Sequence, residues 1–113
     1  MEINLREYVF RIHIIELSGR LDAFTVGTLR NTYKQFLDKD ESNFVIDLSQ
    51  TQFMDSAGMA ALVSLLKRSR QTGGDVILVK PIDPAAYRIL TLTRFDQVFC
   101  LTDTVDEAIQ ELR

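Results

Sequence analysis

One serine stands where a phosphate group would be well received. Ser56 lies in the string Phe53-Met54-Asp55-Ser56-Ala57-Gly58-Met59, directly after an apolar run and directly before a helical pattern. A helix start presents backbone N–H groups without intrahelical partners, together with the positive end of the helix dipole. The commonest role of a serine in such a place is to cap the helix. A functional role therefore depends on the residues around it.

The neighbours of Ser56 favour a functional role. Asp55 precedes it, and the small residues Ala57 and Gly58 leave the backbone accessible. A second strand end falls at Gly19-Arg20-Leu21-Asp22, where Asp22 would by default cap the next helix. In open α/β sheets, binding sites gather at the carboxyl ends of strands. We therefore expect the candidate site to combine Ser56 with its neighbours Asp22, Asp55, Ala57, Gly58 and Met59.

An enzymatic role for Ser56 finds little support in the sequence. The nucleophile elbow of serine hydrolases needs glycine two residues before the serine, and Met54 stands there. The only histidine, His13, falls within an apolar strand pattern, where a general base is not expected. We expect a protein that is not an enzyme and has no catalytic residue.

Other polar residues give weaker signals. Asp22, Asp47 and Asp55 could form the acidic pocket of a phospho-accepting receiver domain, but Lys80 is the only matching late-strand lysine. Cys100 is expected to pack as a small apolar residue in an edge strand. No phosphate-cradling glycine-lysine loop and no histidine-cysteine cluster occurs, so neither a cofactor nor a metal is predicted.

Composition limits the classes of partner. The 113 residues carry a net charge of −3, and the isoelectric point is about 5.1. Without a broad basic face, direct nucleic-acid binding is not expected. No apolar stretch approaches the ~20 residues of a membrane helix, so no membrane span is expected. A single cysteine and the lack of a signal-like N-terminus indicate a cytoplasmic location.

The hydrophobic pattern predicts one α/β domain over residues 1–113. Alternating or solid apolar runs indicate strands, and apolar spacings of three and four indicate helices. The prediction is a mixed, mostly parallel sheet of four to five strands, with an N-terminal hairpin and about four helices. The expected elements are strands at Ile3–Leu5 and Tyr8–Leu17 joined by a turn at Arg6-Glu7, a helix from about Ala23 to Asp38, a strand at Phe44–Leu48, a helix from Ser56 to Gly73-Gly74, a strand at Val76–Val79, a helix from Pro84, a strand at Val98–Leu101, and a helix opened by a capping box at Thr104.

These motifs resemble the STAS domain of bacterial anti-sigma-factor antagonists over nearly the whole chain. The likeness rests on Gly19-Arg20-Leu21-Asp22, Phe44–Ser49, Phe53–Met59, Gly73-Gly74 and Asp103–Leu112. The Asp-Ser-x-Gly element at Asp55–Gly58 is the most specific of them. The resemblance implies a STAS-type fold.

The resemblance also implies a phosphorylation switch that regulates transcription. Ser56 matches the serine phosphorylated by a partner that is both anti-sigma factor and serine kinase. The unmodified protein would bind that partner and release a sigma factor, and a serine phosphatase would reset the switch. Arg20 replaces an acidic residue usual in the family, and Ala57 replaces a second serine or threonine, which leaves Ser56 as the acceptor. The alternative is a STAS scaffold or ligand-sensing subunit of a transport or signalling complex that is not phosphorylated.

Overall fold

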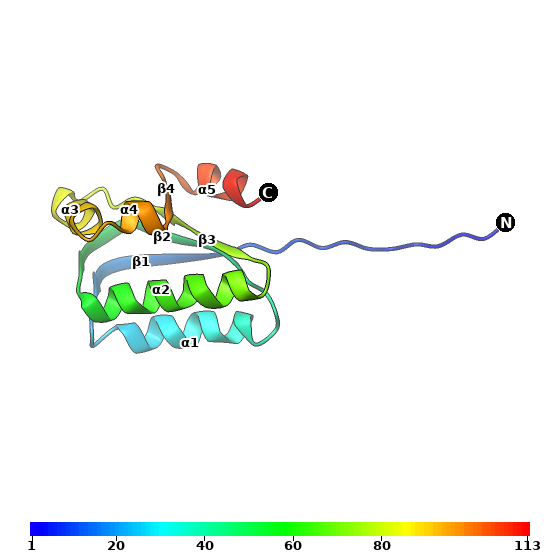
Figure 1. Cartoon of the computed structure of the whole chain (residues 1–113), viewed down its shortest axis with the longest axis horizontal. Coiled ribbons are helices and arrows are strands. Elements are labelled where there is room, and N and C mark those ends of the chain that lie inside the picture. The colour runs from blue at the N-terminus through cyan, green and yellow to red at the C-terminus, as the bar shows by residue number, and fades with distance from the viewer.

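Four parallel strands form the sheet in the order β1-β2-β3-β4, so each strand lies beside its neighbour in sequence (Figure 1). The computed structural model describes residues 1–113. Parallel neighbours need a crossover connection, and helices provide it here. The strands are β1 (His13–Leu21), β2 (Asn43–Met54), β3 (Asp75–Val79) and β4 (Cys100–Thr102).

Helices cover both faces of the sheet. Helices α1 and α2 lie side by side on one face, and α5 lies on the other (Figure 1). The helices are α1 (Val26–Leu37), α2 (Ser56–Gln71), α3 (Pro84–Leu92), α4 (Phe95–Val98) and α5 (Val105–Leu112). None of them is long and apolar enough to cross a membrane.

The solid apolar run of β2 is buried on both faces, as its pattern predicts. Phe44, Ile46 and Leu48 point into the main core, which is closed by α1 and α2. Val45 points the other way, into a smaller cluster with Ala108 of α5. Alternate side chains of a strand face opposite sides of its sheet, so a central parallel strand needs apolar residues at every position.

The predicted N-terminal hairpin is wrong. Residues 1–12 form no strand and run as an extended arm away from the domain (Figure 1), and its last residues, Arg11 and Ile12, contact the domain; β1 begins at His13. The sheet is therefore wholly parallel rather than mixed. The expected turn at Arg6-Glu7 contains none of the residues that tight hairpins favour, such as glycine, asparagine or aspartate.

Several boundaries also differ from the prediction. β1 continues through Gly19 to Leu21, with register shifts against β2 between Glu16 and Ser18 and between Gly19 and Arg20. Gly19 has a φ of 82°, which glycine adopts without strain. A short extra helix, α4, precedes β4. Cys100 is exposed rather than packed in the core, because it faces outward from the edge strand.

Candidate functional site

The carboxyl ends of β1 and β2 bring the two predicted loops together. Leu21 pairs with Met54 at the end of the parallel ladder, and the backbone N–H of Asp55 donates to the carbonyl of Leu21 at 3.2 Å. The turn after β1 therefore meets the first turn of α2. This junction places Asp22 and Asp55 on one rim of the sheet, as the sequence predicts.

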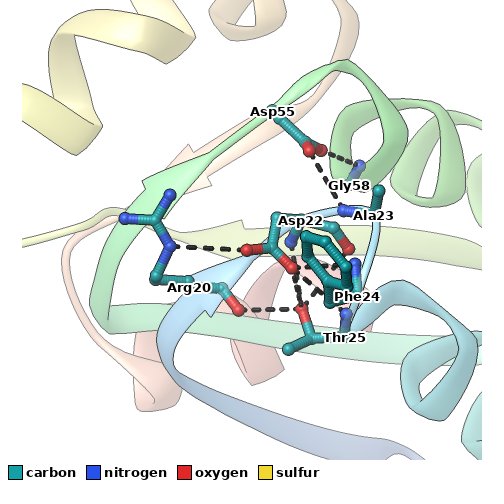
Figure 2. Close-up of polar contacts among 7 residues, drawn as sticks. All are labelled: Arg20, Asp22, Ala23, Phe24, Thr25, Asp55 and Gly58. Carbon is teal, nitrogen blue, oxygen red and sulfur yellow. Dashed lines mark hydrogen bonds and ion pairs between the residues drawn. The ribbon is translucent and has the colours of Figure 1, made fainter.

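Asp55, rather than Ser56, caps helix α2. One carboxylate oxygen of Asp55 accepts a hydrogen bond from the backbone N–H of Gly58 at 2.9 Å (Figure 2). The other oxygen accepts one from the backbone N–H of Ala23 at 3.0 Å. A single carboxylate thus satisfies an unpaired donor of the helix and ties the preceding loop to it.

Asp22 organises the turn that follows β1. Its Oδ1 accepts hydrogen bonds from the backbone N–H groups of Phe24 and Thr25 at 3.0 and 3.1 Å (Figure 2). The Thr25 hydroxyl, in turn, donates to the carbonyl of Arg20 at 2.9 Å. Desolvation of the Asp22 carboxyl opposes its ionisation, but the hydrogen bonds from Phe24, Arg20 and Thr25 outweigh it and hold the pKa of Asp22 below its ordinary value. The turn is therefore built around an ionised carboxylate.

Gly58 allows α2 to approach the end of β1 closely. A Cβ atom at this position would lie 2.5 Å from the carbonyl oxygen of Leu21 and 2.7 Å from its Cγ. No L side chain fits there without movement of the backbone. The glycine is thus required by the contact between two elements, and not only by access to the backbone as the sequence suggests.

Ser56 itself is exposed at the first position of α2. The expectation that it caps the helix is wrong, because Asp55 occupies the cap one residue earlier. The backbone N–H groups of Gly58 and Met59 are bonded to Asp55, whereas those of Ser56 and Ala57 stand ahead of the first intrahelical hydrogen bond. Ser56 therefore presents its hydroxyl beside the first two N–H groups of α2.

The other two predicted neighbours of Ser56, Ala57 and Met59, point partly into the domain. Ala57 and Met59 are half-buried, and Met59 packs against the main core. Thr51 of β2, another hydroxyl residue, is buried and donates to the carbonyl of Leu17 at 3.0 Å. Ser56 is thus the exposed hydroxyl at the start of α2.

Two features of the rim were not found from the sequence. Phe24 is 97% exposed at the tip of the turn held by Asp22. The Arg20 guanidinium lies 4.1 Å from the centre of the Phe53 ring, and its Nε contacts Asp22 at 3.4 Å. A single aromatic residue in a loop is not a signal in the sequence. Only the structure shows that the Phe24 side chain is exposed at the tip of this turn.

The residues of the rejected enzymatic interpretations lie elsewhere. His13 begins β1, at the opposite end of that strand from the rim, and stacks on Phe36 with ring centroids 3.8 Å apart. Lys80 pairs with Asp103 across β3 and β4, and this contact is the main cause that raises the pKa of Lys80. Neither residue meets Ser56 or Asp55. The histidine and the lysine therefore complete no catalytic arrangement at the rim.

Two of the three basic residues of α2 form ion pairs within the domain. Arg70 contacts Asp75 at 3.2 Å, and Arg68 lies 3.8 Å from Asp38. Lys67 is exposed and has no carboxylate within ion-pair distance. Of the three basic residues of α2, Lys67 is thus the one without a carboxylate partner in the protein.

Comparison with known proteins assigns the class. Residues 6–108 match the STAS domain family, so the chain belongs to that family. A candidate anti-sigma factor antagonist of Thermotoga maritima is 32% identical over 81 residues, which are 72% of this chain and 71% of that protein. A crystal structure of a candidate anti-sigma factor antagonist from Thermotoga maritima has a TM-score of 0.83 to this one, with 27% identity, and the match covers 95% of this chain and 92% of that chain.

A second relative is named as an antagonist of an anti-sigma factor. The anti-sigma F factor antagonist of Paenibacillus polymyxa is 28% identical over 100 residues, which are 88% of this chain and 85% of that protein. The relatives of this chain thus include anti-sigma-factor antagonists.

More distant structures share the fold alone. The anti-sigma factor antagonist SpoIIAA in its unphosphorylated form has a TM-score of 0.71 at 19% identity, covering 96% of this chain and 94% of that chain. The phosphorylated form from Bacillus has a TM-score of 0.71 at 21% identity, covering 97% and 98%. A sulfate transporter family protein from Wolinella succinogenes has a TM-score of 0.69 at 20% identity, covering 89% and 84%.

Proposed function

We propose that this protein is an anti-sigma-factor antagonist controlled by phosphorylation of Ser56. In the unphosphorylated form it binds an anti-sigma factor that is also a serine kinase, and the sigma factor is released. Phosphorylation by that kinase ends the interaction, and a serine phosphatase restores it. The observation that carries the proposal is the exposed hydroxyl of Ser56 at the first position of α2, on a rim fixed by Asp55 and Asp22.

The geometry supports a phosphate at Ser56 without loss of the fold. The N–H groups of Ser56 and Ala57 lie at the positive end of the α2 dipole and are available to phosphate oxygens. Asp55 caps the helix, so phosphorylation of Ser56 leaves the capping hydrogen bond in place. The domain should therefore tolerate the added group.

The same phosphate would be unfavourable in an interface. A phosphoserine carries about −1.5 to −2 charges at neutral pH. It would stand beside Asp55 and near Asp22, whose carboxylates are already fixed by hydrogen bonds and do not turn away freely. A partner surface that is acidic or apolar would then face an unpaired, desolvated charge. Binding should fail although the domain remains folded.

Phosphorylation by the kinase tests the proposal directly. Intact-mass measurement after incubation with a candidate anti-sigma kinase and ATP should show one added phosphate on the wild-type protein. The Ser56→Ala variant, which keeps the Asp55 cap, should gain none. Phosphate mapped to Ser18, Ser49 or Thr51 would contradict the assignment.

The alternative is a scaffold or sensing subunit of a transport or signalling complex. The shared fold of the sulfate transporter family protein does not separate the two functions, because the fold is common to both groups. The two curated relatives described above, at 32% and 28% identity, are both named as anti-sigma-factor antagonists, which favours the proposed function over the alternative. Neither function makes this protein an enzyme.

A further inference from the structure

The N-terminal arm and the outer edge of β1 are two extended segments of the chain that have no partner strand on that side. β1 pairs with β2 on one side only, so its other edge offers nine residues of unpaired backbone. This edge carries neither proline nor lysine, and its charged residues are Glu16 and Arg20. The arm over residues 1–12 is extended and gives the molecule a length of 63 Å against widths of 26 and 21 Å (Figure 1).

An apolar groove lies beside the same edge. A cavity of about 400 Å³ opens between β1 and α1, and Ile15, Leu17 and Leu21 supply its apolar wall on the strand side. Thr25, Thr28 and Thr32 line the opposite wall. Ile15 and Leu17 pack against the core but are only half-buried. The groove therefore lies where a further strand would pair with β1, and its apolar wall would pack against the side chains of that strand.

The arm has the pattern of the strand that the groove lacks. Ile3, Leu5 and Val9 are exposed apolar residues at odd positions, and Glu7 and Arg11 are the charged residues of that set. Continued as a strand, they fall on the same face as Ile15 and Leu17, because alternate residues share a face. Directly opposed residues of paired strands also share a face. An antiparallel arm on the β1 edge would therefore place these apolar side chains over the groove.

The arm of the same molecule is poorly suited to reach this groove. A turn at Arg6-Glu7 would pair residues 1–5 with 8–12, before the groove begins at Ile15. A later turn, near Phe10, would fall in the stretch from Leu5 to Leu17, which contains no glycine, proline, asparagine or aspartate. Those are the residues that tight hairpin turns require.

We propose that the arm pairs with the β1 edge of a second copy of this chain, in a reciprocal exchange. The arm and β1 are continuous, so a two-fold axis near Ile12 places each arm antiparallel on the other copy's edge. The length is sufficient, since twelve extended residues span up to about 40 Å and nine strand residues about 30 Å. The exposed apolar side chains of Phe10 and Ile14, both at even positions, then meet on the opposite face. The two sheets join into one continuous sheet.

The oligomeric state of the full chain tests this exchange. Sedimentation velocity of the wild type from low to high micromolar concentration should show a dimer. Leu5→Asp places a charge in the groove contact and should raise the dimer dissociation constant at least about tenfold. A variant lacking residues 2–8 should be monomeric. Ile82→Asp, which changes an apolar residue on a different loop that is 72% exposed, should leave the dimer intact.

The controls separate folding from association. Leu5 is almost fully exposed in this structure, so both arm variants should melt cooperatively and keep the wild-type circular dichroism spectrum. A wild-type protein that is monomeric at every concentration would overturn the exchange and favour an arm closed on its own domain. A dimer that survives in the variant lacking residues 2–8 would also overturn it, because the interface would lie elsewhere.

Discussion

At the scale of single residues, the site depends on the division of labour between Asp55 and Ser56. Asp55 performs the structural task by capping α2 and holding the loop that begins at Ala23. Ser56 is released from capping and presents its hydroxyl to solvent. A modification of Ser56 can therefore change the surface charge of the rim without removing the helix cap.

Replacing Asp55 should destabilise the protein more than replacing Ser56. Asp55→Ala removes two hydrogen bonds and should lower the free energy of unfolding by about 1–3 kcal/mol. Asp55→Asn retains an acceptor for one of them and should cost less. Ser56→Ala breaks no hydrogen bond and should stay within about 0.5 kcal/mol of the wild type. Urea denaturation measures all three, and an equal loss in Ser56→Ala would contradict this division.

The carboxylate of Asp22 should make stability depend on pH. Its pKa is lowered in the folded protein, so its contribution is present above the unfolded pKa of about 3.9 and is lost as pH falls through the folded value. Asp22→Asn should therefore be less stable than the wild type at neutral pH, and the difference should shrink on acidification. Glu2→Gln, on the exposed arm, should show no such pattern. A difference for Asp22→Asn that is constant with pH would reject the charge-based explanation.

At the scale of elements, the close contact between α2 and the end of β1 sets the site. The sequence predicts both elements because the apolar pattern of Tyr8–Leu17 and the helical spacing after Ser56 are strong local patterns. It does not predict which residue caps α2, since aspartate and serine are both favoured caps and stand side by side. The choice follows from the bond between Asp55 and Ala23, a contact between segments distant in sequence.

Substitution of two glycines should distinguish this contact from helix propensity. Gly58→Ala brings a Cβ atom within 2.5 Å of the Leu21 carbonyl oxygen and should cost about 1–3 kcal/mol, the usual cost of overpacking. Gly27→Ala lies in α1 with no atom within 4 Å of the new Cβ and should stabilise the protein by roughly 0.5–1 kcal/mol. Thermal melts of both variants measure the difference. A tolerated Gly58→Ala would mean that α2 can move away from β1 freely.

At the scale of the whole molecule, the sheet separates the proposed docking rim from α5. The rim lies at the start of α2, on the side of the sheet where α1 and α2 pack, whereas α5 covers the other face (Figure 1). The strand and helix order could be predicted from local pattern because each crossover helix is amphipathic. The unpaired arm over residues 1–12 could not, because its apolar residues give the same local pattern as those of a strand within a sheet.

A partner that binds at Ser56 should change amide chemical shifts on one side of the molecule only. Addition of the anti-sigma kinase should shift amide signals around Asp22, Phe24 and Ser56, and along the exposed side of α2 toward Lys67. Signals around Ile109 of α5 should be unchanged, since that helix faces away. Shifts concentrated at Ile109 would show that the rim is not the docking face.

The most direct test of the central claim compares the affinity of the two phosphorylation states for one partner. Calorimetric titration of the anti-sigma kinase should show binding to the unmodified protein and more than about tenfold weaker binding to the protein phosphorylated at Ser56, because an unpaired charge in an interface commonly costs about 2–5 kcal/mol. Ser56→Asp should weaken binding in the same direction, with a thermal melt close to that of the wild type. Equal affinity of the two phosphorylation states would contradict the switch, and a collapsed melt of the phosphorylated protein would show that Ser56 is chiefly a structural residue.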